Sequence, residues 1–229
     1  MRQIIGLLGV KGSGKDTCAQ FLTDEQDYAR IGFADALYEE VADAFGVTVA
    51  FLGNRETKEK DLPELALNRG SDAAFAKVVQ EELGLAPGES IEHFNAAPRS
   101  PRLVLQFWGT EYRRRRGVDS YWLDVVRSAI AAQEYRHFVV TDVRFNNEAN
   151  FIESLACMGS TGILVRIRRP VLEEREAAER STQGRAAHPS ETELLARPVS
   201  FEVENIEGDQ DSLRRGIFSV LELTAAPPA

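Results

Sequence analysis

The chain has 229 residues, of which 43% are hydrophobic and 28% are charged, so it is long enough for one α/β domain with insertions and a sizeable core. Its net charge of −9 argues against a nucleic-acid-binding protein that relies on an overall positive field. No run of about 18 apolar residues is present, and the apolar start is too short for a signal peptide, so we expect neither a membrane span nor secretion.

The first predicted elements are a buried strand over 3–8 and a helix over 15–23, joined by the sequence GVKGSGKDT at 9–17. This strand, loop and helix form the context of a phosphate-binding loop. Glycines let the main chain approach an anion closely, and the amides at the helix N-terminus bind phosphate oxygens beside the charge of Lys15. The predicted contacts of the donor phosphates are Gly12, Ser13, Gly14, Lys15, Asp16 and Thr17.

Asp16 departs from the general pattern of such loops, in which Ser or Thr follows the lysine as a magnesium ligand. Here the hydroxyl is displaced by one residue to Thr17, as in the loops of nucleoside monophosphate kinases. Asp16 would hold a magnesium-bound water or face the acceptor phosphate. The alternative is that its carboxylate only caps the helix, and the sequence leaves both roles open.

A second strand over 28–33 and a helix over 34–45 follow, with apolar residues at helical spacing. Residues 46–117 then interrupt the alternation of strands and helices. This region carries helical pieces over 72–84 and 101–108, separated by loops rich in Pro and Gly. Insertions over the carboxyl edge of a parallel sheet are where such folds bind ligands, so we expect the region to bind the acceptor.

The end of this insertion is rich in arginine, with six Arg against one Glu over 99–116. Gln106 is a candidate for a hydrogen bond to a base edge, and the run from Arg113 to Arg116 is either an acceptor-phosphate clamp or a solvated helix end. Three aromatic residues are candidates for stacking on the base: Trp108, Tyr112 and Trp122. Aromatic residues at this spacing are more often core residues.

The next predicted elements are a helix over 119–133, with Asp119 as its N-cap, a strand over 137–142 and a helix over 146–158. The strand ends in Asp142, and an acidic residue at a neighbouring strand end can orient magnesium through water. Arg144 follows, and its guanidinium could fork onto a phosphate. The alternative is an ordinary strand whose end becomes polar at the surface.

Strands over 162–168 and 199–204 flank a polar excursion over 169–197, and a helix over 210–223 follows. Residues 166–185 hold six Arg against four Glu, so some of these arginines belong to a solvated helix face. Arginines stabilise the charge of a transferring phosphoryl group. The candidates are Arg168 for the donor, Arg169 for catalysis, and Arg180 and Arg185 for the acceptor.

These patterns predict an α/β fold of the P-loop kinase type, with a five-stranded parallel sheet and helices on both faces. We expect a single domain over 1–229 with an acceptor-binding insertion at 46–117 and a lid at 169–197. Cys18 and Cys157 lie in apolar helical patterns and read as core residues of a reducing compartment. The three histidines are scattered and form no metal-ligand pattern.

Five segments, in order along nearly the whole chain, resemble the deoxynucleoside monophosphate kinases of tailed bacteriophages. They are GVKGSGKDT (9–17), LQFWGTE (105–111), TDVRFNNE (141–148), HPSE (188–191) and VENIEG (203–208). The phosphate loop is shared by many kinases, whereas the succession of all five is more specific. Residues 53–100 match no part of the pattern, so the preferred base is not indicated.

The resemblance implies transfer of the ATP γ-phosphoryl group to a deoxynucleoside 5′-monophosphate, with magnesium. Lys15 and the loop amides would bind the donor, and Arg144 would grip the acceptor phosphate. Asp16 and Thr17 would order magnesium and the acceptor, and Asp142 is the further magnesium candidate from its place at the strand end. The turn from Asn205 to Gly208 would lie beside the donor adenine. Lys11 is a candidate for binding the substrate.

The expected partners are small-molecule nucleotides, with no nucleic acid and no membrane, in the cytoplasm or in that of a host if a phage encodes the chain. A homodimer is left open. One alternative keeps the fold and changes the acceptor to another phosphorylated metabolite, such as dephospho-coenzyme A. A second is a nucleotide-binding switch or hydrolase, although no guanine-reading Asn-Lys-x-Asp is present.

Overall fold

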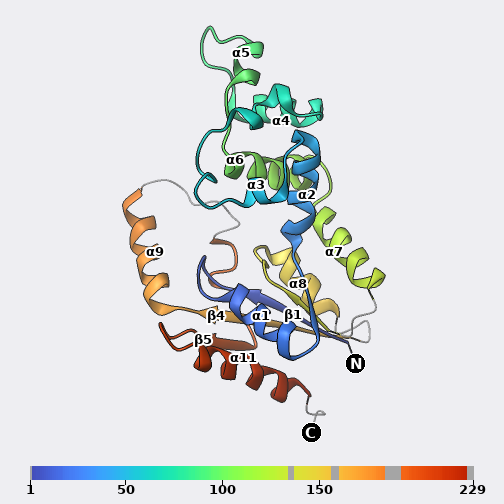
Figure 1. Cartoon of the computed structure of the whole chain (residues 1–229), viewed down its shortest axis with the longest axis vertical. Helices are drawn as coiled ribbons and strands as arrows, with labels where there is room; N and C mark the ends of the chain where they lie inside the picture. The colour runs from blue at the N-terminus through green and yellow to red at the C-terminus, as the bar shows by residue number, and fades with distance from the viewer. Residues whose placement is uncertain (1, 134–136, 156–159, 184–191, 226–229) are drawn as a thin grey trace. The chain divides into compact units, whose positions relative to one another are not determined.

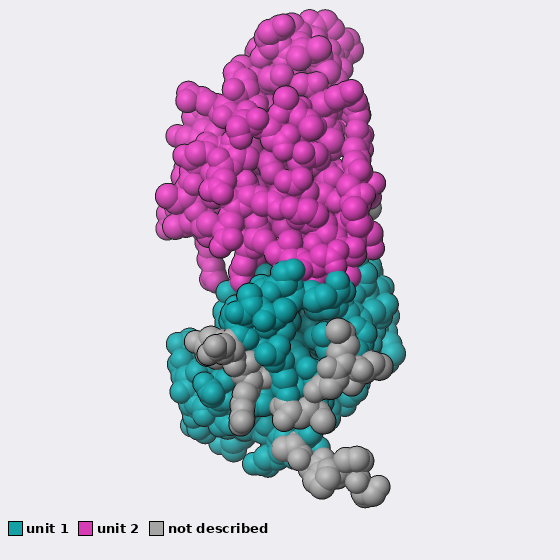
Figure 2. Space-filling view, turned by 90° about the vertical axis from the view of Figure 1, so that its right-hand side faces the viewer, with its two compact units in different colours: residues 1–32, 126–229 teal, residues 33–125 magenta. Residues whose placement is uncertain are grey.

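The structure is a computed structural model that describes residues 2–133, 137–155, 160–183 and 192–225. The chain divides into two compact units, distinguished by colour in Figure 2. Unit 1 contains residues 1–32 and 126–229, and unit 2 contains residues 33–125. None of the helices in the described ranges has the length and apolarity that crossing a bilayer requires.

Unit 1 is built on a parallel sheet of five strands, drawn in Figure 1. The strands are β1 (Arg2–Leu8), β2 (Tyr28–Ile31), β3 (His137–Val140), β4 (Ser160–Arg168) and β5 (Phe201–Glu204). Their order is β2-β3-β1-β4-β5, which confirms the predicted sheet. Because β2 and β3 lie on one side of β1 and β4 and β5 on the other, the carboxyl end of β1 is a topological switch point, where such sheets bind ligands.

Helices cover both faces of this sheet, as predicted. On one face, Ile5 and Leu7 of β1 pack in one core cluster with residues of α1 (Lys15–Glu25) and α11 (Gln210–Ala225). On the other face, a Cβ atom added at Gly6 would lie 3.3 Å from Ile152 of α8 (Asn146–Ser154). The alternation of side chains along a strand explains why neighbouring residues of β1 serve opposite layers.

Cys18 lies in the first of these layers and is fully buried, as predicted for a core residue. Burial raises the pKa of its thiol to about 12, so the sulfur stays protonated and inert at neutral pH. Cys157 lies outside the described residues.

Two further helices belong to this part of the chain. The helix α9 (Pro170–Gln183) follows β4, and α7 (Tyr121–Ala132) crosses the boundary between the units. The helix predicted over 119–133 is therefore confirmed, but it begins two residues later than its expected cap. Ser120 precedes its first residue, and its hydroxyl bonds to the Asp124 carboxylate at 3.0 Å.

Unit 2 is helical. Its elements are α2 (Phe33–Phe45), α3 (Val49–Gly53), the 3-10 turns η1 (Pro63–Leu65) and η2 (Leu67–Arg69), α4 (Ala73–Leu83), α5 (Ile91–Ala96), α6 (Pro101–Gln106) and the π-helix η3 (Phe107–Arg115). Side-chain caps explain several starts: Asp72 accepts from two amides of α4, and Ser100 accepts from the Leu103 amide of α6. The predicted helical pieces over 72–84 and 101–108 are thus confirmed, although the second changes to π geometry, which the sequence did not indicate.

Candidate functional site

The loop after β1 has a main-chain shape that requires glycine. Gly9, Gly12 and Gly14 have φ angles of 140°, 78° and 109°, which L-residues with side chains rarely adopt. A Cβ atom at Gly9 would lie 2.4 Å from the Ile167 carbonyl oxygen of β4. The loop therefore keeps its curvature and lies directly against the sheet only because these positions carry no side chain.

The helix α1 starts with its amides open to a ligand. Gly14 is its N-cap and supplies no side-chain cap. The first amides of a helix have no partner within the helix, and the helix dipole adds positive potential at this end, so the position favours an anion. Asp16 is exposed in the first turn and Thr17 is half-buried. Both roles proposed for Asp16, toward magnesium and as a helix-dipole partner, fit this position.

The ammonium group of Lys15 lies on the loop itself. Its Nζ donates to the carbonyl oxygens of Gly9 at 2.7 Å and Val10 at 2.8 Å. The pKa of Lys15 is lowered to about 8, first by burial and then by the positive charge of Arg144. Three carboxylates act in the opposite direction: Asp16, Glu176 and Asp142. These electrostatic interactions show that the predicted residues Lys15, Asp16, Asp142 and Arg144 come together at one place.

The buried carboxylate of Glu148 fixes the segment that carries Arg144. This side chain is 2% exposed and accepts hydrogen bonds from the main-chain amides of Arg144 at 2.7 Å and Phe145 at 3.1 Å. In the second of these bonds, the Glu148 side chain at the third position of α8 caps the amide of the N-cap residue Phe145. Sequence reasoning did not single out Glu148, although an acidic residue at the third position of a predicted helix is the signal that would have found it.

Two donors from distant parts of unit 1 reach the outer carbonyls of the loop. The Asn205 amide nitrogen donates to the Ser13 carbonyl oxygen at 2.7 Å. Arg169 donates through Nη1 to the Gly12 carbonyl oxygen at 3.3 Å and through Nη2 to Glu207 at 2.9 Å. Both were predicted as site residues, and both contact the phosphate loop.

The residues of this site fit a nucleoside triphosphate with magnesium. The Ser13 hydroxyl oxygen is buried and has no hydrogen-bond partner among the described residues, so it is an orphaned polar atom inside the loop. The described residues contain no group of three His, Cys, Asp or Glu that could hold a metal alone. Magnesium is typically bound by one or two carboxylates together with substrate phosphates. The oxygens of Asp16, Thr17 and Asp142 would supply the protein's ligands in such a site.

Comparisons with known proteins point to the same chemistry. No family model matches the chain. Over 99% of both chains, it is 28% identical to the deoxynucleoside-5′-monophosphate kinase of Escherichia phage T5. The predicted resemblance to phage deoxynucleoside monophosphate kinases is confirmed. A protein of Acanthamoeba polyphaga mimivirus, provisionally named a deoxynucleotide monophosphate kinase, is 27% identical over 83% of this chain and 81% of its own length.

Solved structures resemble the chain more distantly. TT1252 from Thermus thermophilus superposes with a TM-score of 0.46 at 16% identity, over 97% of each chain. Dephospho-CoA kinase from Campylobacter jejuni superposes with a TM-score of 0.41 at 13% identity, over 96% of each chain. Similarities at this level carry no conclusion about the activity of the chain.

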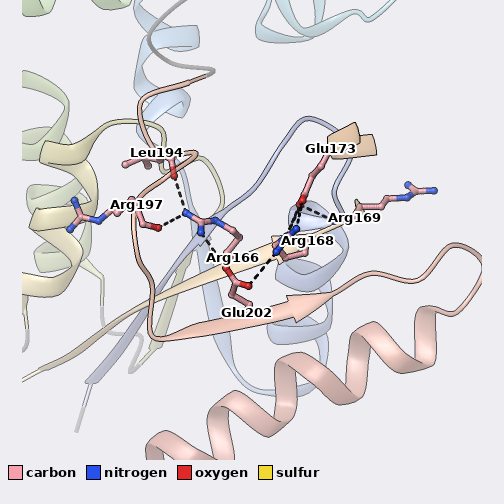
Figure 3. A network of polar contacts seen from close by, with 7 residues as sticks. All are labelled: Arg166, Arg168, Arg169, Glu173, Leu194, Arg197 and Glu202. Atoms are coloured by element: carbon pink, nitrogen blue, oxygen red, sulfur yellow. Dashed lines mark hydrogen bonds and ion pairs between the residues drawn. The ribbon is translucent and has the colours of Figure 1, made fainter. Parts of the chain in front are cut away.

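Beside the kinase-like loop, the other arginines of β4 are held in ion pairs, as Figure 3 shows. Arg168 pairs with Glu173 at 2.7 Å and with Glu202 at 3.6 Å, and Glu173 raises the pKa of its guanidinium. Arg166 donates to the main-chain carbonyls of Leu194 and Arg197 and so connects β4 to the segment before β5. Arg168, predicted to bind the donor, is therefore charge-compensated without nucleotide.

The predicted lid helix α9 begins next to the loop. A Cβ atom at Gly12 would lie 3.4 Å from the Leu172 side chain, and Glu176 is close enough to Lys15 to raise its pKa. The side chain of Arg180, and all of Arg185 and the HPSE segment at 188–191, lie outside the described residues. Their predicted roles remain predictions.

Two of the substrate residues predicted in unit 2, Trp108 and Arg113, bond to the Glu40 carboxylate. Trp108 is 2% exposed, its indole N–H donates to Glu40 at 2.8 Å, and its ring lies 4.6 Å from that of Phe75, which are the contacts of a core residue. Arg113 also donates to Glu40 at 2.8 Å, and its guanidinium lies 4.7 Å from the centre of the Tyr112 ring. The hydroxyl of Tyr121 is a third donor to the same carboxylate.

Arg113 also lines a cavity of about 450 Å³, a volume within the range of small-molecule sites. The cavity lies between α4, η3 and the start of α7. Gln106, at the end of α6, is half-buried, and Lys11, in the phosphate loop of unit 1, is exposed.

Proposed function

We propose that the chain transfers the γ-phosphoryl group of ATP to the 5′-phosphate of a deoxynucleoside monophosphate, forming a deoxynucleoside diphosphate and ADP. The observation that carries the proposal is a preformed phosphate loop in a chain that matches the phage T5 kinase from end to end. The reaction uses ATP and magnesium and takes place in the cytoplasm, where these are available.

The donor triphosphate is bound by the amides of the loop and of the first turn of α1. Lys15 exchanges the carbonyl oxygens of Gly9 and Val10 for phosphate oxygens, since its ammonium already lies over the loop. Thr17, Asp16 and Asp142 would hold magnesium, which would supply positive charge to neutralise the phosphate oxygens. Phosphoryl transfer is accelerated mainly by such positioning and charge stabilisation.

The acceptor phosphate is gripped by Arg144, whose positive charge acts on Lys15 and whose main chain is fixed by Glu148. A phosphate is already anionic at neutral pH, so no strong general base is required. The insertion at 46–117 supplies further acceptor contacts, for which Gln106 and Arg113 are the candidates. The segment at 169–197 closes over the reactants and excludes water, which would otherwise accept the phosphoryl group.

An acceptor panel tests this function. The purified chain is given ATP and magnesium with each of the common deoxynucleoside and ribonucleoside monophosphates, and with dephospho-coenzyme A, and the products are separated by chromatography. We expect a diphosphate from at least one deoxynucleoside monophosphate at a rate well above that with dephospho-coenzyme A. The absence of diphosphate from every monophosphate, or a clear preference for dephospho-coenzyme A, would overturn the proposal.

A further inference from the structure

The turn between β5 and α11 contacts the phosphate loop through the carbonyl oxygens of the loop. Asn205 donates to the Ser13 carbonyl oxygen at 2.7 Å. Glu207 of the same turn pairs with Arg169, whose second guanidinium nitrogen donates to the Gly12 carbonyl oxygen. Two successive carbonyls of the loop are thus held by side chains that lie more than 150 residues further along the chain.

The hydrogen bond from Asn205 to the Ser13 carbonyl determines which way the main-chain amide of Gly14 points. The described residues contain no cis peptide bond, so the peptide between Ser13 and Gly14 is trans and planar. In such a peptide the carbonyl oxygen and the amide hydrogen point to opposite sides. Because Asn205 holds the Ser13 oxygen outward, the Gly14 amide points to the inner side of the loop, where a phosphate oxygen would accept from it.

Asn205 is itself held in place, and the loop fits closely against it. Its own main-chain amide donates to the Arg168 carbonyl oxygen at 2.7 Å, in continuation of the pairing between β4 and β5. A Cβ atom at Gly14 would lie 2.5 Å from the side-chain amide nitrogen, Nδ2, of Asn205. The short distance between the two segments therefore depends on the glycine at one position and the carboxamide at the other.

We infer that Asn205 is a positioning residue for triphosphate binding, which acts through the Ser13 carbonyl and the Gly14 amide and not through the base of the nucleotide. The identity of the nucleotide rests on the proposed function, whereas the contact between Asn205 and the loop does not. The role differs from the one that the family resemblance implies, in which the turn from Asn205 to Gly208 lies beside the adenine.

Two ligands that differ only in the nucleoside distinguish these roles. The wild type, Asn205→Ala and Asn205→Asp are titrated calorimetrically with inorganic tripolyphosphate and with a non-hydrolysable ATP analogue, each with magnesium. We expect Asn205→Ala to weaken both ligands by the same factor, about five- to tenfold, which corresponds to one lost hydrogen bond. Asn205→Asp should weaken both further, because its carboxylate faces a carbonyl oxygen and adds negative charge near the phosphates.

Asn150→Ala is the matched control. Asn150 is an exposed residue of α8 in the same unit, where it accepts from Arg197, and its replacement should change neither affinity. Thermal unfolding is followed for each variant, and Asn205→Ser supplies the same comparison if the alanine variant does not fold.

Weakened binding of the ATP analogue with unchanged binding of tripolyphosphate would overturn the inference in favour of a contact with adenine. Unchanged affinity for both ligands, or no binding of tripolyphosphate by the wild type, would also overturn it. A wild type that binds both ligands but forms no diphosphate with any monophosphate would contradict the proposed function and leave the role of Asn205 intact. The two proposals therefore fail separately.

Discussion

The phosphate loop and the arginine-rich segments carry the same kind of signal in the sequence, yet they differ in how their structure is determined. In the loop, the groups that face a ligand are main-chain amides and one lysine within nine consecutive residues. Several arginines instead bond to distant side chains: Arg113 bonds to Glu40, 73 residues earlier, and Arg166 pairs with Glu202, 36 residues later. Arg168 has a nearer partner in Glu173.

This difference shows that an arginine in a sequence does not by itself identify a phosphate-binding group, because its guanidinium can be paired with a carboxylate of the protein. Arg113 and Arg168 are both paired with carboxylates, so a phosphate that binds either guanidinium must compete with Glu40 in one case and with Glu173 in the other. In the loop, by contrast, the Ser13 amide donates to the Val10 carbonyl oxygen of the loop itself, and the buried Ser13 hydroxyl has no partner among the described residues. Variants of both regions can break or sharpen the contrast.

The largest effect is expected for Lys15→Ala. Loss of the ammonium removes a charge that the transferring phosphoryl group requires, so kcat/KM should fall by at least about 10³-fold. The fold should persist, because the hydrogen bonds of the Lys15 ammonium within the described residues are to the Gly9 and Val10 carbonyl oxygens of its own loop. Lys60→Ala, at an exposed position of unit 2, is the control. A folded Lys15→Ala variant with wild-type kcat would contradict the role of the lysine.

Gly9→Ala should be nearly as damaging, through the shape of the loop. The added methyl group would lie 2.4 Å from the Ile167 carbonyl, at a φ angle of 140°, so the loop must move. We expect loss of nucleotide binding and a fall of about 2–4 kcal/mol in the free energy of unfolding, measured with urea.

Gly46→Ala separates the effect of a positive φ angle from the effect of the steric contact with β4. Gly46 also has a positive φ angle, of 63°, but no atom lies within 4 Å of its added Cβ. Its replacement should cost only about 1 kcal/mol and leave nucleotide binding unchanged. Equal losses in the two variants would show that steric contact with β4 is unimportant.

Arg144→Ala should act on one substrate only. Loss of a charged contact to the acceptor phosphate predicts a KM for the acceptor about 10- to 100-fold higher, with little change in the KM for ATP. Arg215→Ala, an exposed position of α11, serves as the control in steady-state kinetics. If both KM values rose together, Arg144 would have a structural role instead.

Glu40→Gln tests the arginine-rich region, where the guanidinium of Arg113 is paired with the Glu40 carboxylate. The carboxylate accepts from Trp108, Arg113 and Tyr121, and a carboxamide would leave the half-buried guanidinium without its counter-charge. We expect the free energy of unfolding to fall by about 1–3 kcal/mol, with the affinity for ATP unchanged. Glu39→Gln replaces the exposed neighbouring carboxylate and should change neither. A variant as stable as the wild type would mean that Arg113 does not depend on Glu40.

The pH dependence of nucleotide binding gives the smallest effect. The lowered pKa of Lys15 means that the ligand-free protein loses this positive charge near pH 8 instead of near 10.5. Affinity for an ATP analogue should therefore decrease as the pH rises, by about eightfold between pH 7.5 and pH 9 if binding requires the ammonium form. Lys15→Arg keeps its charge throughout and should bind with a flat profile, measured calorimetrically over the same range. A wild type as flat as this variant would contradict the lowered pKa.

Most of the fold could be predicted because its signals are local. The five strands, the helices that pack on them and the glycine loop each show in a short window of apolar periodicity or glycine spacing. The π geometry over Phe107–Arg115 could not be predicted, since the same residues fit the pattern of an ordinary helix. The shared bond of Trp108 and Arg113 to Glu40 could not be predicted either, because the partners lie 68 and 73 residues apart in the sequence.

Within the site, the sequence identified the residues that touch the loop but not how they do so. Asn205 and Arg169 were both singled out, one for adenine and one for catalysis, yet each donates to a carbonyl of the loop. A hydrogen bond across more than 150 residues depends on the strand order, which a single sequence indicates only coarsely. Glu148 was missed although its signal is local: it lies at the third position of the predicted helix and accepts from main-chain amides three and four residues earlier.

A single-turnover experiment with ATP labelled in the γ-phosphate tests the central claim most directly. The chain is mixed with labelled ATP, magnesium and the deoxynucleoside monophosphate that performs best in the acceptor panel, and the products are quenched and separated. The label should be recovered in the β-phosphate of the deoxynucleoside diphosphate, and Lys15→Ala should leave it in ATP. Release of the label as inorganic phosphate, at a rate independent of the acceptor, would contradict a kinase and indicate a hydrolase.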